Sequence, residues 1–116
     1  MELKIFDIIG KRCITKENGQ RIFERIHPLL LKGKNVNLNF GGVEQFASPF
    51  FNYAIGQLLK DIKDDDLEKL LRIDNLDNDG RLVVKRVIEN AKNYHRDIDY
   101  KKVVDSILQQ TEEGAG

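Results

Sequence analysis

Two hydrophobic periods alternate along the chain. Residues 36–40, Val-Asn-Leu-Asn-Phe, alternate strictly between apolar and polar side chains, which predicts a strand with one buried face. The apolar positions of residues 3–9 predict an earlier strand that ends at Gly10. In residues 69–76, leucine and isoleucine alternate with charged residues, which predicts a third strand.

Apolar residues at spacings of three and four predict helices between and after these strands. Thr15 is placed to cap the first helix, and Pro28 predicts a kink or an end near His27, because its ring clashes with the carbonyl four residues earlier. Ser48 and Pro49 are typical of the N-cap and first positions of a second helix. The apolar stripes of the four predicted helices are Ile22, Phe23, Ile26, Leu29 and Leu30; Phe51, Ile55, Leu58 and Ile62; Val84, Val87, Ile88 and Ala91; and Tyr100, Val103, Val104, Ile107 and Leu108.

The order of elements is strand, helix, strand, helix, strand, helix, helix. Such alternation predicts an α/β layer fold with helices packed on a small sheet. The polar stretches 64–66 and 77–80 are predicted to be turns between elements. Residues 1–111 are assigned to one domain, which is the number expected for this length, and residues 112–116 to a polar tail or an appended remnant.

The amino-acid composition disfavours several classes of function. The chain has 19 basic and 19 acidic residues, so its net charge is zero. A binder of nucleic acid needs a basic excess to pair with phosphates, so that class and an anionic membrane surface are both disfavoured. A single cysteine and an N-terminus without a continuous apolar run predict a cytoplasmic protein.

Residues 75–82 resemble the first part of a calcium-binding loop. Oxygen-bearing side chains stand at positions one, three and five, and Gly80 stands at position six. The twelfth position is Arg86, where such a loop needs a glutamate. We therefore interpret the segment as a turn in which Asp77 or Asp79 caps the following helix.

The residues most often used in catalysis are few and scattered. His27, His95 and Cys13 have no acid or base at a spacing typical of a catalytic or ligand set. The pair Gly41 and Gly42 lacks the further residues of a phosphate-binding loop. The sequence predicts neither a cofactor nor a metal, and a small enzyme that uses His95 or Cys13 is the weakest alternative.

The segment 38–51 is the most suggestive one. Gly41 and Gly42 allow a sharp turn after the strand, and Ser48 then presents its hydroxyl at the start of a helix. One interpretation is that this hydroxyl accepts a backbone N–H and stabilises the helix by about 1 kcal/mol. The other is that it is phosphorylated and controls docking of a partner. Phe50 and Asn52 would then belong to the docking surface, supported by Ala47 and Pro49.

At this segment the chain resembles the STAS domains (sulphate transporter and anti-sigma-factor antagonist), and is most similar to a bacterial STAS-like family. The resemblance rests on the strand 36–40, the Gly42-Val43 pair, the segment 46–51 (Phe-Ala-Ser-Pro-Phe-Phe) and the strand end 73–76 (Ile-Asp-Asn-Leu). Antagonist-type STAS domains have an aspartate followed by a phosphorylated serine at the start of a helix. Ser48 falls on that serine, whereas Ala47 stands in place of the acid.

The resemblance implies a small α/β domain with a mixed central sheet and helices along it. It implies a regulatory protein-binding module, not an enzyme, whose partner is a serine kinase, a related ATPase of the histidine-kinase type or another regulator of the same pathway. The alternative is a self-associating domain without a phosphoswitch, a homodimer formed through the C-terminal helix. That alternative follows from the apolar stripe of residues 100–108.

Overall fold

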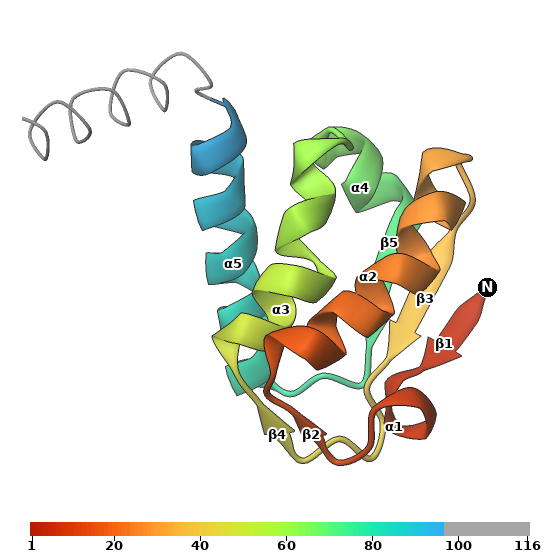
Figure 1. Cartoon of the computed structure of the whole chain (residues 1–116), viewed down its shortest axis with the longest axis vertical. Coiled ribbons are helices and arrows are strands. Elements are labelled where there is room, and N and C mark those ends of the chain that lie inside the picture. The colour runs from red at the N-terminus through yellow and green to blue at the C-terminus, as the bar shows by residue number, and fades with distance from the viewer. Residues whose placement is uncertain (97–116) are drawn as a thin grey trace, which may run out of the picture.

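The alternating segment forms the middle strand of a parallel sheet. In the computed structural model, which describes residues 1–96, β1 (Glu2–Lys4), β3 (Val36–Asn39) and β5 (Leu71–Asp74) pair in the order β1-β3-β5 (Figure 1). The small α/β fold is therefore confirmed. Every strand pair in this part of the chain is parallel, where the family resemblance implied a mixed sheet. The predicted helix over residues 99–108 lies outside the described residues.

The register of the sheet separates an apolar from a polar face. Leu3 lies opposite Leu38, and Leu38 opposite Ile73, and these side chains face the core. On the other face, Asn39 donates from Nδ2 to Glu2 Oε1 at 2.7 Å and accepts from Asn75 Nδ2 at 2.8 Å. Hydrogen bonds between side chains thus join the three strands on the face that the helices do not cover.

The first predicted strand is shorter than its apolar pattern suggested. β1 ends at Lys4 and is followed by a single helical turn, α1 (Ile5–Ile8), so the strand prediction was wrong for residues 5–9. Ile5 is fully buried while Phe6 is exposed, a pattern that one turn of helix satisfies as well as a strand does. Two short parallel strands were missed, β2 (Arg12–Cys13) and β4 (Gln45–Phe46). Two residues are too few to show a period.

Helix α2 (Lys16–Leu31) begins as predicted. The hydroxyl of Thr15 accepts a hydrogen bond from the Asn18 N–H at 3.2 Å. The helix runs through Pro28 to Leu31, so the prediction of an end near His27 was wrong. Ile26 and Leu30 are buried on either side of the proline, and their packing offsets the missing backbone hydrogen bond.

The second predicted helix is divided. α3 (Ser48–Ala54) is followed by a 3₁₀ helix, η1 (Gly56–Lys60), although Phe51, Ile55, Leu58 and Ile62 are all buried as the stripe predicted. Residues 64–66 are not a turn but the first turn of α4 (Asp64–Leu70). Three carboxylates there complement the positive end of the helix dipole. The final described helix, α5 (Asn78–Arg96), contains the predicted apolar stripe, but it begins at Asn78, so the prediction of a turn was wrong for residues 78–80.

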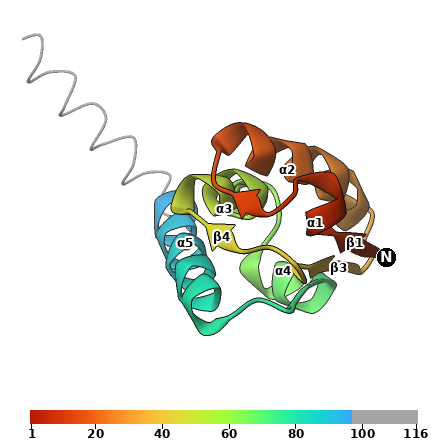
Figure 2. The same cartoon turned by 90° about the horizontal axis from the view of Figure 1, so that it is seen from below.

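The helices form a layer over the apolar face of the sheet. Figure 2 shows α3 between α2 and α5, and α2 and α3 share the most extensive contact of any two elements within residues 1–96. Gly19 on α2 lies against the backbone of Phe50 on α3. Among the helices of residues 1–96, none has the length and apolar character needed to span a membrane.

Candidate functional site

The loop after β3 turns at two glycines, as predicted. The Gly41 N–H donates to Asn39 Oδ1 at 2.9 Å, and Gly42 has a φ of +89°, which favours glycine. A Cβ on Gly42 would lie 3.1 Å from the ring of Phe6 on α1. The loop is therefore fixed in its conformation and leads the chain directly into β4.

Strand β4 ties the loop to the N-terminal part of the chain. The Glu44 N–H donates to the Lys11 carbonyl at 2.8 Å, and the Ala47 N–H to the Cys13 carbonyl at 3.0 Å. This pairing holds the residue before Ser48 in an extended conformation. The start of α3 is thus positioned by two parallel strands that the sequence did not reveal.

Ser48 does not cap α3. Ala47 occupies the N-cap position, with φ −145° and ψ 151°, and no side chain caps this helix. The prediction that the Ser48 hydroxyl accepts an N–H from Phe50 or Phe51 was therefore wrong by one position. Ser48 is the first residue of the helix and is exposed, as is Pro49. The serine side chain therefore makes no capping hydrogen bond that stabilises the helix.

Phe50 cannot take part in docking. Phe50 and Phe51 are both fully buried, and their ring centroids lie 5.3 Å apart. They pack against Phe40 at the end of β3, at centroid distances of 6.4 and 5.8 Å. The prediction that Phe50 reaches a partner was wrong. These aromatic rings hold α3 in place beneath the exposed serine.

The exposed residues of α3 form a small surface. Asn52 is exposed one turn after Ser48 on the same face of the helix. Tyr53 follows, with 38% of its surface accessible. It lies in a shallow hollow with residues of α2, among them Glu17 and Arg21. The sequence analysis named Ser48 and Asn52 but missed Tyr53, which follows the buried pair of phenylalanines.

The contacts of Cys13 and His27 are those of residues that stabilise the fold. The Cys13 side chain is fully buried, and its burial raises the pKa of the thiol to about 12, so it stays protonated and unreactive. His27 Nε2 lies 2.9 Å from Asp61 Oδ2, and its ring stacks on Phe23. The side chain of His95 lies outside the described residues. His27 is thus paired with the carboxylate of Asp61, and Cys13 is closed off from solvent.

The calcium-like segment is a helix cap. Asp77 Oδ1 accepts a hydrogen bond from the Gly80 N–H at 2.8 Å, so Asp77 is the cap of the two candidates, Asp77 and Asp79, that the sequence offered. A Cβ on Gly80 would meet the Leu76 side chain at 2.5 Å, so glycine is needed there for close packing. Within residues 1–96, no group of three His, Cys, Asp or Glu residues could hold a metal ion.

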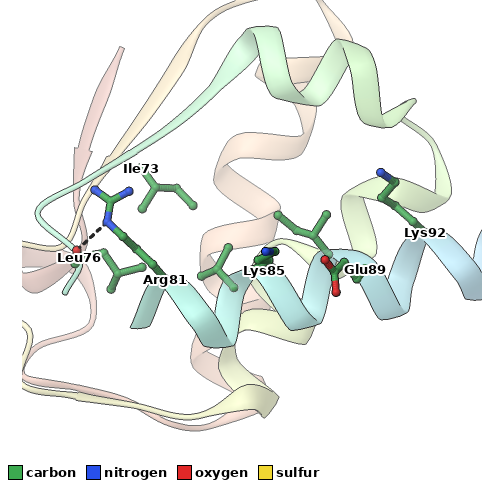
Figure 3. Close-up of a pocket in the computed structure, with 8 residues that line it drawn as sticks. Ile73, Leu76, Arg81, Lys85, Glu89 and Lys92 are labelled. Carbon is green, nitrogen blue, oxygen red and sulfur yellow. Dashed lines mark hydrogen bonds between the residues drawn. The ribbon is translucent and has the colours of Figure 1, made fainter. Parts of the chain in front are cut away.

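A second concave surface was not predicted at all. Two adjoining cavities of about 380 and 370 Å³ share Ile73, Ile88 and Lys92, and together they form a groove between α4, β5 and α5. Figure 3 shows the residues that line the first cavity. We call it the β5–α5 groove. Its apolar floor consists of Leu59, Leu71, Ile73, Leu76, Val84 and Ile88, and charged residues on α4 and α5 line its sides. Its two sides come from segments separated in the sequence.

Comparison with known protein families identifies the family of this chain. The model of a family described as a STAS-like domain of unknown function (DUF4325) matches residues 18–81. The chain belongs to this STAS-like family. The matched region of the STAS-like domain includes the glycine turn, Ser48 and the whole of α3. No curated protein and no solved structure matches the chain.

Proposed function

We propose that this STAS-like domain is a bacterial regulatory module that binds a protein partner through a surface centred on Ser48. The observation that carries the proposal is the exposed Ser48 side chain, which makes no capping hydrogen bond although it stands at the start of a helix. Asn52, exposed one turn later on the same face of α3, extends this surface. An amide one turn away from a hydroxyl provides hydrogen-bonding groups for a protein surface.

Phosphorylation of Ser48 is the switch in this proposal. A phosphate adds up to about two negative charges and several acceptor oxygens. The fold can accommodate it at Ser48, because this side chain is exposed and its hydroxyl makes no capping hydrogen bond. The phenylalanine pair beneath it keeps α3 in place in both states. The partner is a serine kinase or a related ATPase of the histidine-kinase type, which would both bind and modify the surface.

The test compares four baits in an extract of the native cells. They are the wild-type domain, Ser48→Ala, Ser48→Asp and Asn90→Asp, and captured proteins are identified by mass spectrometry. Asn90 is exposed on α5, so its replacement adds the same charge on a different helix from Ser48. We expect one kinase-like ATPase with the wild type, Ser48→Ala and Asn90→Asp, and its loss with Ser48→Asp.

Two results would contradict the proposal in different ways. Equal capture by all four baits would refute the phosphorylation switch. The domain would then bind its partner through a surface that does not depend on charge at Ser48. If the wild type, Ser48→Ala and Asn90→Asp captured no common partner, the proposal that the domain binds a protein would be refuted. Phosphopeptide mapping of the chain purified from the same cells tests the modification directly, with phosphate expected on the tryptic peptide that contains Ser48.

A further inference from the structure

The β2–β4 pair has an inner and an outer face. Cys13 is fully buried and lies opposite the half-buried Phe46, so these two side chains form the inner face. Successive side chains of a strand point to opposite faces, which turns Arg12 and, directly after β2, Ile14 outward. Both are exposed, and 38% of the Ile14 surface is accessible. The outer face therefore presents a large aliphatic side chain next to a cation.

This outer face is continuous with the start of α3. The Ala47 N–H donates to the Cys13 carbonyl at 3.0 Å, so Ala47 continues the register of β4 and lies opposite Ile14. Ser48 is the next residue along the chain and is exposed. Figures 1 and 2 show β2, β4 and the start of α3 together at one end of the molecule. A protein that covers Ser48 would therefore also meet Ile14.

Positive charge surrounds Ile14 along the chain. Residues 10–16 contain three cations and no acid, and the cations Lys11, Arg12 and Lys16 are all exposed. Glu17 follows Lys16 directly, and the Glu44 N–H donates to the Lys11 carbonyl at 2.8 Å, so acids adjoin both ends of this segment. Arg12 is thus the cation of the outer face itself, and it complements a carboxylate on a protein that docks there.

We propose that the outer face of β2–β4 provides most of the affinity of the docking surface, with Ile14 as its apolar anchor and Arg12 as its charged contact. The inference rests on the proposed function and adds the chemistry of the partner, which packs an apolar side chain on Ile14 and places a carboxylate beside Arg12. Serine seldom contributes much to the affinity of an interface, whereas arginine and buried apolar area do. A phosphate on Ser48 would repel the partner's carboxylate, which is a physical reason for release.

The test measures the affinity of the full chain for the purified ATPase that the wild-type bait captures. Ile14→Ser and Arg12→Glu are compared with Leu82→Ser and Arg86→Glu, which are the same replacements at exposed positions of α5. We expect the dissociation constant to rise about tenfold or more for the first two variants and to change by less than about twofold for the two controls. Circular dichroism should show the wild-type fold in all four, because every replaced side chain is exposed.

The outcomes separate this inference from the proposed function. If Ile14→Ser and Arg12→Glu bind the ATPase as tightly as the wild type, the anchor lies elsewhere and the inference is wrong, while the proposed function stands. If the wild type captures no such ATPase, the proposed function fails and the inference fails with it.

Salt dependence checks the role of Arg12 separately. Raising the ionic strength from about 0.05 M to about 0.5 M should weaken binding of the wild type, because salt screens the attraction between Arg12 and a carboxylate. The same change should not weaken binding of Arg12→Glu, and an equal loss in both proteins would contradict the charged contact.

Discussion

Gly19 of α2 lies in direct contact with the backbone of Phe50 on α3. A Cβ at position 19 would overlap the Phe50 carbonyl oxygen and stand 2.9 Å from Tyr53 Cβ. The absence of a side chain is what lets the two helices approach so closely. This contact sets the position of α3, and with it that of the exposed residues Ser48 and Asn52.

The first prediction concerns this contact. Gly19→Ala should lower the free energy of unfolding by about 1–3 kcal/mol, because the added methyl group forces two backbones apart. The intrinsic preference of a helix for alanine, about 1 kcal/mol, acts in the opposite direction and is smaller. Urea denaturation measures the change. Gly56→Ala is the matched control, since its Cβ would be 3.4 Å from Val87 Cγ1 and should fit nearly without strain. Equal losses in the two variants would contradict the interpretation.

The second prediction concerns the start of α3. Because Ala47 is the N-cap residue, Ala47→Ser should raise the free energy of unfolding by about 0.5 kcal/mol: the new hydroxyl would share the Phe50 N–H, which already donates to the Ala47 carbonyl at 3.2 Å. Ser48→Ala should change it by less than about 0.5 kcal/mol, as for other exposed positions. Thermal and urea unfolding of both variants give the values. A loss of about 1 kcal/mol in Ser48→Ala would instead assign the cap to Ser48.

The third prediction concerns pH. Burial raises the pKa of the Cys13 thiol from 9.0 to about 12, so the thiol stays protonated in the folded protein while it ionises in the unfolded chain. The contribution of this group to stability is complete below pH 9 and declines as the pH rises from about 9 toward 12. Comparison with Cys13→Ala isolates the effect, because the wild type should lose stability more steeply in that range. A thiol reagent at pH 8 should react only after unfolding, and rapid reaction with the folded protein would refute the burial.

The fourth prediction concerns the cap of α5. Asp77→Ala should lower the free energy of unfolding by about 1 kcal/mol, because the Gly80 N–H loses its acceptor. Asp77→Asn retains an acceptor oxygen and should cost less than half of that amount. Addition of calcium or of a chelator should leave the unfolding temperature of the wild type unchanged. A rise with calcium that Asp77→Ala abolishes would show a metal site instead of a cap.

Some features of the chain followed from local sequence alone. The strict alternation of residues 36–40 predicted β3, and Thr15 was identified as a helix cap, because its partner lies three residues away. The cap of α5 was narrowed to Asp77 or Asp79, and the structure decides for Asp77. The likeness to STAS-like domains could also be recognised, because most of its motif lies within residues 36–51. These sequence signals involve residues that are close together in the chain, so they can be recognised without knowledge of the fold.

Other features depended on contacts between distant segments, which only the tertiary structure decided. The strand β2 exists because Cys13 pairs with Phe46, and neither two-residue segment has a pattern of its own. Phe50 is buried by Phe40 and by the approach of Gly19, so a residue that adjoins an exposed serine lies in the core. Helix α2 continues through Pro28 because packing on both sides of it outweighs one lost hydrogen bond. Local pattern determines which faces are apolar, whereas burial and pairing depend on what the rest of the chain places against them.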